Sequence, residues 1–345
     1  MHMADALISP AVGGTMWAAT AGLAAYSARR AQVDLDDKKI PLMGVLGAFV
    51  FAAQMINFTI PGTGSSGHLG GGLILAILLG PYAGLLTMAS ILAVQALFFA
   101  DGGLLALGCN IFNMGFYGCF IAYPLLFKPF IRKTVTPGRI VTGAMLASVI
   151  GLQLGAFSVV LETLLSGRSE LPFPTFVLLM QPIHLAIGVV EGLITAAVVT
   201  FVWKARPEIL ERTAAGEGYG GIAIKKVLAG LALAAVLTGG ALSWFASVHP
   251  DGLEWSIAKT AGTDELKNSG GIHEFLSDWR EKIAFLPDYG FKEAAEPKPA
   301  EAEAGPESWP AVNGGTSVAG LVGGGLTLLL AALIGFGLRR VKKRA

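Results

Sequence analysis

Hydrophobic residues in this chain are gathered into long runs that short polar links separate. A helix that crosses a bilayer needs about 20 consecutive, mostly apolar residues. The runs that reach or approach this length are 11–28, 41–60, 82–100, 104–127, 138–165, 176–203, 225–245 and 318–338. The pattern therefore predicts an all-α polytopic membrane protein.

The run 70–80, "GGGLILAILLG", is only about half as long as a full span. Pro81 follows it and lacks the N–H group that would continue the helical ladder. We therefore expect a short or half-inserted helix that turns back at the proline, where surrounding protein shields its irregular backbone from lipid. Counted as a crossing, this run brings the predicted segments to nine.

The distribution of basic residues tests this count and sets the orientation, because Lys and Arg near span ends collect on the cytoplasmic side. With the amino terminus outside and 70–80 counted as a crossing, all of the 25 basic residues fall inside except Arg168 and those of the loop 246–316. Without that crossing, the basic tail "RRVKKRA" would be exported. We therefore expect the loop 246–316 outside and the chain after Leu338 inside.

The predicted spans divide into two units. Residues 1–204 form a seven-helix substrate-binding unit, and residues 225–345 form a two-helix hairpin with the extracytoplasmic loop 246–316. Residues 205–224 are a cytoplasmic linker that contains "AAGEGYGG". Because the stretch "EAAEPKPAEAEAGPE" in the outer loop cannot bury a core, we interpret that loop as a solvated spacer. A cation-attracting surface is the alternative.

Composition agrees with a membrane protein and excludes several functions. The chain is 53% hydrophobic and 14% charged, with a mean hydropathy of +0.63, which lies outside the range of soluble proteins. A net charge of +1 argues against a nucleic-acid partner. Cys109 and Cys119 lie in an apolar stretch without CxxC spacing and are expected to be packing residues. The sequence has no P-loop "GxxxxGK[ST]" for nucleotide hydrolysis and no HExxH motif.

The opening stretch "MHMADALISP" places His2 beside the amino terminus. A free α-amine has a reference pKa of about 7.7–8.0, so it can lose its proton to a metal ion near neutral pH. We expect Met1 to be retained, since His2 is large, and its amine to chelate together with the amide and imidazole nitrogens of His2. His68, in the outer loop "PGTGSSGHLGGG", can supply a fourth nitrogen. Four nitrogens in a plane suit Ni(II) or Cu(II), and imidazole also suits cobalt and zinc.

Polar residues inside the predicted spans are weaker candidates. Asn110 and Asn113, in "CNIFNMG", either orient the His2 region through hydrogen bonds or hold helices together. His184 and Glu191 lie two turns apart on one helix face. We interpret them as an interhelical polar pair, with a metal exit path as the alternative.

The remaining polar residues receive structural interpretations. We expect Gln95 and Asp101 to be packing and capping residues. We expect His249 and His273 to lie on the surface of the outer loop, and the chain from Lys225 onward to contribute little to metal ligation.

Four stretches carry a family resemblance: "MHMADALISP", "SGHLGGGLILAILLGP", "QALFFADGGLLALGCNIFNMG" and "HLAIGVVEG". Together they cover most of residues 1–204, and there the chain resembles the metal-specific membrane subunits of energy-coupling factor transporters for cobalt and nickel, the CbiM/NikM type. The unit 225–345, with "HPDGLEWS" at 249–256, is similar to the small accessory component of such systems, a PDGLE or CbiN/NikN-like segment. Here it is fused to the permease.

The resemblance implies that the metal is held by the amino-terminal nitrogen of Met1, by the amide and imidazole of His2, and by His68. The cargo would be Ni(II) or Co(II), with no organic cofactor, and the choice between the two metals stays open. Some family members read Ile-Pro-Asp-Gly where this chain reads Met-Ala-Asp-Ala at 3–6. Residues that we expect to support the ligands are Asp5, Ser66, Asn110 and Asn113.

The mechanism implied by the resemblance is capture outside and release inside the cytoplasmic (inner) membrane of a prokaryote. Because the chain has no P-loop, the energy would come from partners, an ATPase pair and a coupling transmembrane subunit. Two other classes stay open, a membrane metal sensor and an intramembrane metal-dependent hydrolase. The hydrolase would need a motif such as HExxH, which is absent.

Overall fold

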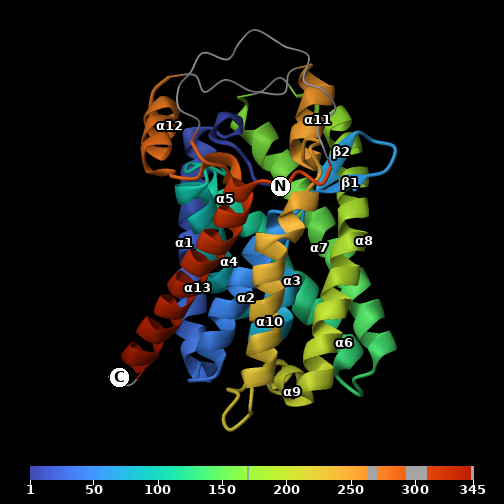
Figure 1. Cartoon of the computed structure of the whole chain (residues 1–345). Helices are drawn as coiled ribbons and strands as arrows, with labels where there is room; N and C mark the ends of the chain where they lie inside the picture. Colours follow the sequence, from blue (N-terminus) through green and yellow to red (C-terminus); the bar gives the residue numbers. More distant parts are fainter. Residues whose placement is uncertain (169–170, 263–269, 293–308, 343–345) are drawn as a thin grey trace.

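The computed structural model is a bundle of helices, and it describes residues 1–168, 171–262, 270–292 and 309–342 (Figure 1). The long helices are α1 (Pro10–Asp34), α2 (Lys39–Gln54), α4 (Pro81–Phe98), α7 (Pro137–Ser166), α8 (Phe173–Ala205), α10 (Lys225–Gly240) and α13 (Gly314–Lys342). Between them lie α3 (Gly72–Leu79), α5 (Leu107–Ile111), η2 (Phe112–Phe127), α6 (Lys128–Ile131) and α9 (Pro207–Ala215). A second set of short elements comprises η1 (Asp5–Leu7), β1 (Phe58–Ile60), β2 (Ser65–Gly67), η3 (Leu242–Phe245), α11 (Gly252–Ala261), α12 (Ile272–Ile283) and η4 (Pro287–Tyr289).

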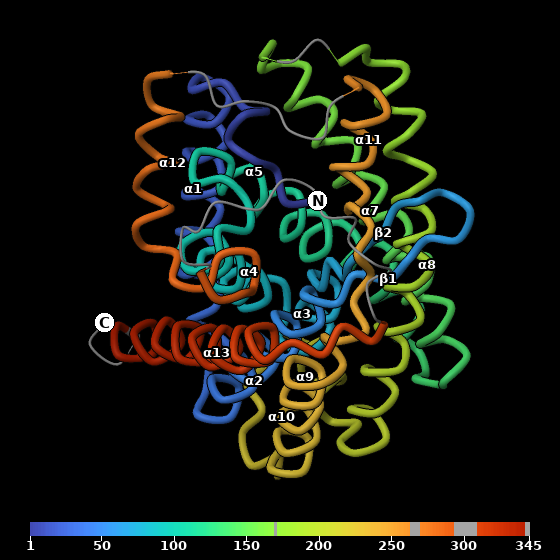
Figure 2. Tube along the Cα trace, turned by 45° about the horizontal axis from the view of Figure 1, so that its top comes forward, coloured from blue at the N-terminus to red at the C-terminus, as the bar shows by residue number. Residues whose placement is uncertain are grey.

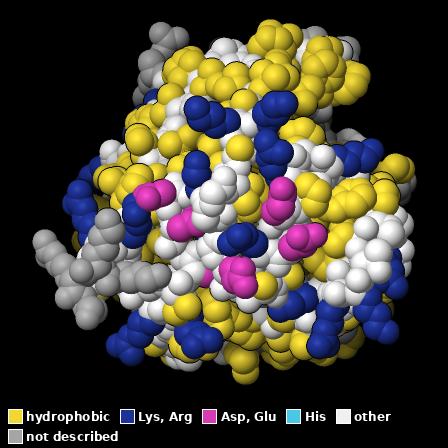
Figure 3. Space-filling model, turned by 90° about the horizontal axis from the view of Figure 1, so that it is seen from below, with side chains coloured by type: hydrophobic (Ala, Val, Ile, Leu, Met, Phe, Trp, Pro, Cys, Tyr) yellow, Lys and Arg dark blue, Asp and Glu magenta, His cyan; other side chains and the backbone are white. Residues whose placement is uncertain are grey.

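The bundle has two distinct ends. The amino terminus, the β1–β2 hairpin, α11 and α12 lie at one end, which we call the Met1 end (Figure 1). The helix α9 and the last turns of α13 lie at the opposite end, which we call the α9 end. Seen from below in Figure 3, the α9 end carries many Lys and Arg side chains around a smaller group of carboxylates.

Five of the described helical segments are long and apolar enough to cross a membrane: 81–98, 107–131, 137–166, 173–205 and 314–341. The apolar helix α2 is shorter, with 16 residues. The chain is therefore an α-helical, multi-pass membrane protein, as the hydrophobic runs predicted. Each predicted run corresponds to helix in the described part of the chain.

The half-length run 70–80 forms α3, which is bracketed by two glycines with positive φ. Gly71 (φ 80°) precedes the helix and Gly80 (φ 85°) ends it, a conformation that glycine adopts without steric cost. Pro81 then opens α4, where its missing N–H group is not needed. The predicted break at the proline is confirmed.

The helix α3 leads from the Met1 end toward the α9 end. Its carbonyl at Leu78 accepts hydrogen bonds from the hydroxyls of Tyr219 and Thr213, which belong to the α9 end. Every residue of α3 is buried, so protein rather than lipid surrounds this short helix. The path of α3 agrees with counting 70–80 as a crossing.

Two predicted runs differ from the observed elements. The run 41–60 ends as helix at Gln54, because 58–60 pairs with 65–67 as an antiparallel hairpin. The run 104–127 changes from α5 into the wider π-helical turns of η2. Such wide turns often occur at functional sites.

The interpretation of the outer loop 246–316 as a solvated spacer is wrong for its described parts. Asp251 caps α11, and α12 and η4 follow within 270–292. His273, expected on the surface, is buried, and its Nε2 lies 2.8 Å from the carbonyl oxygen of Ile8. His249 is exposed, as expected. The stretch "EAAEPKPAEAEAGPE" (293–307) lies outside the described residues.

The helices of the carboxy-terminal part pack on the amino-terminal part. Both α10 and α13 contact α2, and α13 also contacts α4. Figure 2 shows α13 and α10 lying along α2. Small residues permit this approach, since a side chain at Gly323 would collide with the ring of Phe51. The two predicted units therefore pack against each other along α2.

Candidate metal centre

The amino terminus lies in the interior of the Met1 end, against the loop that carries His68. The Met1 nitrogen lies 3.1 Å from Nε2 of His68 across a sequence separation of 67, and both residues are buried. Nδ1 of His68 lies 3.1 Å from the carbonyl oxygen of Leu69. If Nδ1 carries the proton and donates to that carbonyl, the Nε2 lone pair faces the amine. Histidines that bind metals commonly have this arrangement.

A chain of amide groups fixes the state of His2. Gln54 donates to the carbonyl of Gly70 (2.8 Å), and Gln95 donates to Oε1 of Gln54 (3.0 Å). This orients the oxygen of Gln95 toward Nε2 of His2, at 3.1 Å. If Nε2 carries the proton and donates to this oxygen, Nδ1 keeps its lone pair. Nδ1 lies 3.3 Å from Oδ1 of Asp101.

The two imidazoles lie face to face and are uncharged near neutral pH. Their ring centroids are 4.9 Å apart, with 20° between the planes. Burial, together with the neighbouring Met1 ammonium, lowers the pKa of His2 to about 3. The same causes, with His2 itself, lower the pKa of His68 to about 3. Both rings therefore present free lone pairs.

The backbone of Met3 is clamped by Asn110. The Met3 N–H donates to Oδ1 of Asn110 (2.8 Å), and Nδ2 of Asn110 donates to the Met3 carbonyl (3.2 Å). The Gly103 N–H donates to the same carbonyl (2.8 Å). These bonds fix the chain one residue after His2.

Asp5 anchors the first turn of the chain to the loop after α4. Its carboxylate accepts from the N–H of Leu104 (3.2 Å) and from the N–H of Ala106 (3.0 Å). Asp5 is 3% exposed, and its carboxylate bonds are to the loop after α4. It therefore holds the amino-terminal segment in place without touching the imidazoles.

Asp251 brings a carboxylate to the amino terminus from the carboxy-terminal part of the chain. Its Oδ2 lies 3.3 Å from the Met1 nitrogen and 3.8 Å from Nε2 of His68. Burial acts to raise the pKa of Asp251, but the Met1 ammonium and His68 outweigh it, so this pKa lies below its ordinary value. Asp251 is therefore ionised.

An open cavity of about 370 Å³ adjoins His2, His68 and Asp251. Its lining includes His2 and His68, together with polar groups from the outer segment that follows α10. Those groups are Asp251, Glu254, Arg280, Asp288 and Tyr289. The cavity gives an ion from that side of the molecule access to both imidazoles.

The other predicted site residues lie farther from the amine. Ser66 donates to the carbonyl of His249 at 2.8 Å. Asn113 donates to Glu162 at 2.7 Å. Both polar contacts therefore join separate parts of the chain, and neither one reaches His2.

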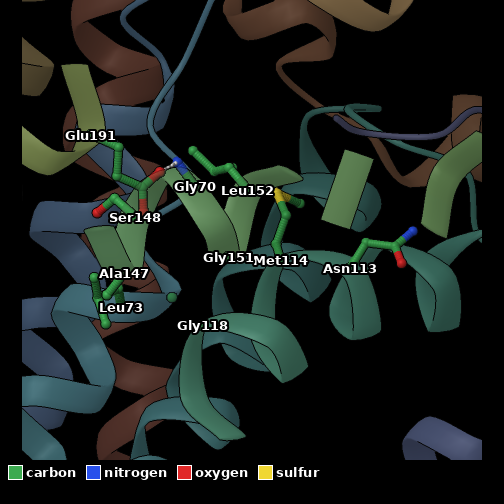
Figure 4. Close-up of a pocket in the computed structure, with 11 residues that line it drawn as sticks. Gly70, Leu73, Asn113, Met114, Gly118, Ala147, Ser148, Gly151, Leu152 and Glu191 are labelled. Carbon is green, nitrogen blue, oxygen red and sulfur yellow. Dashed lines mark hydrogen bonds between the residues drawn. The ribbon is translucent and has the colours of Figure 1, made fainter. Parts of the chain in front are cut away.

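His184 and Glu191, interpreted as a polar pair, each bond the backbone instead. Nδ1 of His184 lies 2.8 Å from the Met180 carbonyl oxygen. Glu191 accepts from the N–H groups of Gly70 (2.7 Å) and Gly71 (3.1 Å), directly after the His68 loop. Figure 4 shows Glu191 meeting Gly70 beside a small cavity of about 20 Å³. Glu191 thus satisfies the irregular backbone that precedes α3.

Side chains alone do not make a metal site in the described part of the chain. No three His, Cys, Asp or Glu residues there gather as a ligand set. The described groups that converge at Met1 include its own nitrogen, the imidazoles of His2 and His68, and the carboxylate of Asp251. A metal ion at this place would meet the Met1 nitrogen beside these side chains.

The sequence did not reveal Asp251, Gln54 and Tyr289 as neighbours of the site. Asp251 had a local signal, since an Asp followed three residues later by Glu254 predicts a helix start. That signal says nothing about a partner 250 residues away. Asp101, interpreted as a capping residue, contacts His2 and accepts from the Tyr289 hydroxyl (2.5 Å).

Two family models match the chain. The model CbiM, described as a cobalt uptake substrate-specific transmembrane region, matches residues 2–209. The PDGLE domain model matches residues 225–340.

Similar proteins are metal transporters by name. A protein of Archaeoglobus fulgidus, provisionally named a fused nickel transport protein NikMN, is 36% identical over 215 residues, which are 62% of this chain and 70% of that protein. The cobalt transport protein CbiM of Sorangium cellulosum is 30% identical over 220 residues, which are 61% of this chain and 95% of that protein. A crystal structure of a truncated transition metal transporter matches with a TM-score of 0.53 and 28% identity, over 59% of this chain and 99% of that one.

Proposed function

Because the chain belongs to the CbiM family, with a PDGLE segment fused behind it, we propose that it is the metal-capture subunit of an ATP-driven energy-coupling factor importer for nickel or cobalt ions. The family is one of metal transport components rather than enzymes. We propose separate ATPase subunits because this sequence has no P-loop of its own.

The cargo ion would be bound by four nitrogens: the Met1 amine, the amide and Nδ1 of His2, and Nε2 of His68. The observation that carries this proposal is the 3.1 Å separation of the Met1 nitrogen and Nε2 of His68. Two nitrogens at right angles around one metal, each about 2.0 Å from it, would lie about 2.8 Å apart. The pair is thus nearly at ligand spacing before an ion is present.

The hydrogen bonds of His2 favour its role as a chelating ligand. Gln95 occupies Nε2, so Nδ1 is the nitrogen with a free lone pair. Nδ1 is also the ring nitrogen that closes a six-membered chelate with the residue's own amide. On metal binding the ring would turn from Asp101 toward that amide.

The surrounding polar residues would support these ligands in different ways. Asn110 and Asp5 would fix the strand that begins at Met1 through the bonds described above. Ser66 would fix the His68 loop against the segment before α11. Removing a residue that holds a metal ligand in place typically weakens metal binding about 10–100-fold.

Metal uptake tests the functional proposal. Cells that make the chain together with an ATPase pair and a coupling membrane protein should accumulate radioactive nickel or cobalt, and cells without the ATPase genes should not. The purified chain should bind the ion by itself in either case. Accumulation without the ATPase, or binding with no uptake in the complete system, would contradict an energy-coupled importer.

We also propose that the Met1 end faces outward and the α9 end faces the cytoplasm of a prokaryotic cell. The basic residues of the α9 end support this orientation (Figure 3). Cysteine substitutions at exposed Val248 and exposed Glu217 test it, because the native Cys109 and Cys119 are buried. An impermeant maleimide should label Val248→Cys in intact cells and Glu217→Cys only after permeabilisation. The reverse pattern would contradict the orientation.

A further inference from the structure

We propose that Asp251 is a positioning residue of the metal-capture site, so that both family units of this chain build the site together. This inference rests on the proposed function, because it concerns the same donors at Met1, His2 and His68. Its starting observation is that Oδ2 of Asp251 lies 3.3 Å from the Met1 nitrogen and 3.8 Å from Nε2 of His68.

The helix that Asp251 begins holds its carboxylate in a defined direction. Oδ1 accepts from the N–H groups of Leu253 and Glu254, both at 2.8 Å. Glu254 returns the interaction by accepting from the N–H of Asp251 at 3.1 Å. This reciprocal capping of α11 occupies one oxygen and leaves Oδ2 toward the amine.

The chain before α11 is tied to the loop that carries His68. The N–H of Ser66 donates to the carbonyl of Pro250 (2.8 Å), and its hydroxyl donates to the carbonyl of His249 (2.8 Å). Ser66 and Asp251 thereby form a parallel bridge between the two segments. Because this bridge joins the two units two residues from His68, backbone bonds set the position of Asp251 relative to the His68 loop.

Close packing around Gly252 also holds the start of α11 against α8. A side chain at Gly252 would collide with Ile183 of α8 and would reach Cε1 of His184 at 3.4 Å. The glycine lets α11 approach α8 closely. The carboxylate one residue earlier is then held against the amino terminus rather than in solvent.

Asp251 brings negative charge to the buried nitrogens of Met1 and His68. The side chains of Met1 and Asp251 are 3% and 14% exposed, so salt screens their interaction weakly. A divalent ion at the Met1 and His68 nitrogens would bring more positive charge to this place than the ammonium does. The carboxylate therefore orients the empty site and attracts the ion that fills it.

The outer segment also reaches the His2 side of the site. The hydroxyl of Tyr289 donates to Oδ2 of Asp101 (2.5 Å), and Oδ1 of Asp101 lies 3.3 Å from Nδ1 of His2. Arg280 donates to the carbonyl of Gly102 (3.2 Å). The carboxy-terminal unit therefore contacts the site on the Met1 side through Asp251, and on the His2 side through Tyr289 and Asp101.

The substitution Asp251→Asn tests the proposal in the full-length chain with its native amino terminus. Asparagine caps helices about as well as aspartate, so α11 keeps its cap while the charge is lost. We expect NiCl2 titration to show affinity about 10–100-fold weaker than wild type. The visible d–d spectrum of bound Ni(II), which reports the donor set, should be unchanged.

Two further variants keep this test decisive. Asp251→Ser, a second neutral cap, should weaken nickel binding as Asp251→Asn does. Asp278→Asn removes an exposed carboxylate of α12 and should leave the affinity unchanged. Wild-type affinity in both Asp251 variants would overturn the positioning role while leaving the proposed function intact. Failure of the wild-type chain to bind nickel would instead overturn the proposed function.

Discussion

A chain with one glycine placed before Met1 is expected to lose high-affinity nickel binding. The extra residue turns the Met1 amine into an amide, which must lose its proton before it can bind a metal and which shifts the terminal amine away from His68. It also removes the ammonium that pairs with Asp251. The loss should exceed the roughly 10–100-fold that follows removal of a supporting contact, because a direct ligand is lost.

The pocket around Met1 adds a steric reason. Met1 is 5% exposed, and its terminal methyl group would lie 3.5 Å from a side chain placed at Gly155. Another residue before it would have to displace His68 or Asp251, which lie 3.1 Å and 3.3 Å from the Met1 nitrogen. Isothermal titration with NiCl2 measures the effect, and the same glycine added after Ala345 is the control. Because the new terminus Gly-Met-His offers its own amine, amide and imidazole nitrogens, the visible d–d spectrum of bound Ni(II) is recorded as well. Equal affinity with an unchanged spectrum would show that the Met1 amine is not a ligand.

Replacing Gly103 with alanine is expected to displace the amino terminus and to reduce nickel affinity more than tenfold. A side chain at Gly103 would overlap the carboxylate and the backbone nitrogen of Asp5. Asp5 is tied to Leu104 and Ala106, and the Gly103 N–H is bonded to Met3, so neither partner can move independently. The first residues would have to shift as a unit, away from His68.

The matched control for this variant is Gly14→Ala. Gly14 lies in α1, and a side chain there would meet nothing within 4 Å. Overpacking costs about 1–3 kcal/mol, so Gly103→Ala should still fold, with a modestly lower melting temperature. Nickel titration and thermal unfolding of both variants separate affinity from stability. Wild-type affinity in Gly103→Ala would mean that the Asp5 anchor does not position the ligands.

The membrane helices could be predicted because lipid constrains sequence strongly over short distances. A run such as 138–165 needs no knowledge of its neighbours to be identified as a span. The break at Pro81 likewise followed from the missing N–H group. The change of helix type at 112–127 and the early end of α2 at Gln54 did not follow, because both depend on packing against other segments.

The ligand residues could be proposed from chemistry, but their environment could not. Met1, His2 and His68 attracted attention through their donor atoms and the family resemblance. The chain Gly70–Gln54–Gln95–His2, which selects the tautomer of His2, joins residues 16, 41 and 93 positions apart. No local pattern encodes such pairings. For the same reason, the bonds of Glu191 to the backbone after His68 could not be predicted, although Glu191 itself was a candidate residue.

The contact between Met1 and Asp251 also has a consequence for how the protein is made. Its two partners are 250 positions apart in the chain. At ribosomal rates of about 5–20 residues per second, on the order of 10–50 s separate the synthesis of the amine from that of its carboxylate. Throughout that interval the membrane holds a growing chain whose first residue lacks its counter-charge. A product that terminates before Asp251 would lack this carboxylate permanently, so the contact forms only when the second unit has been translated.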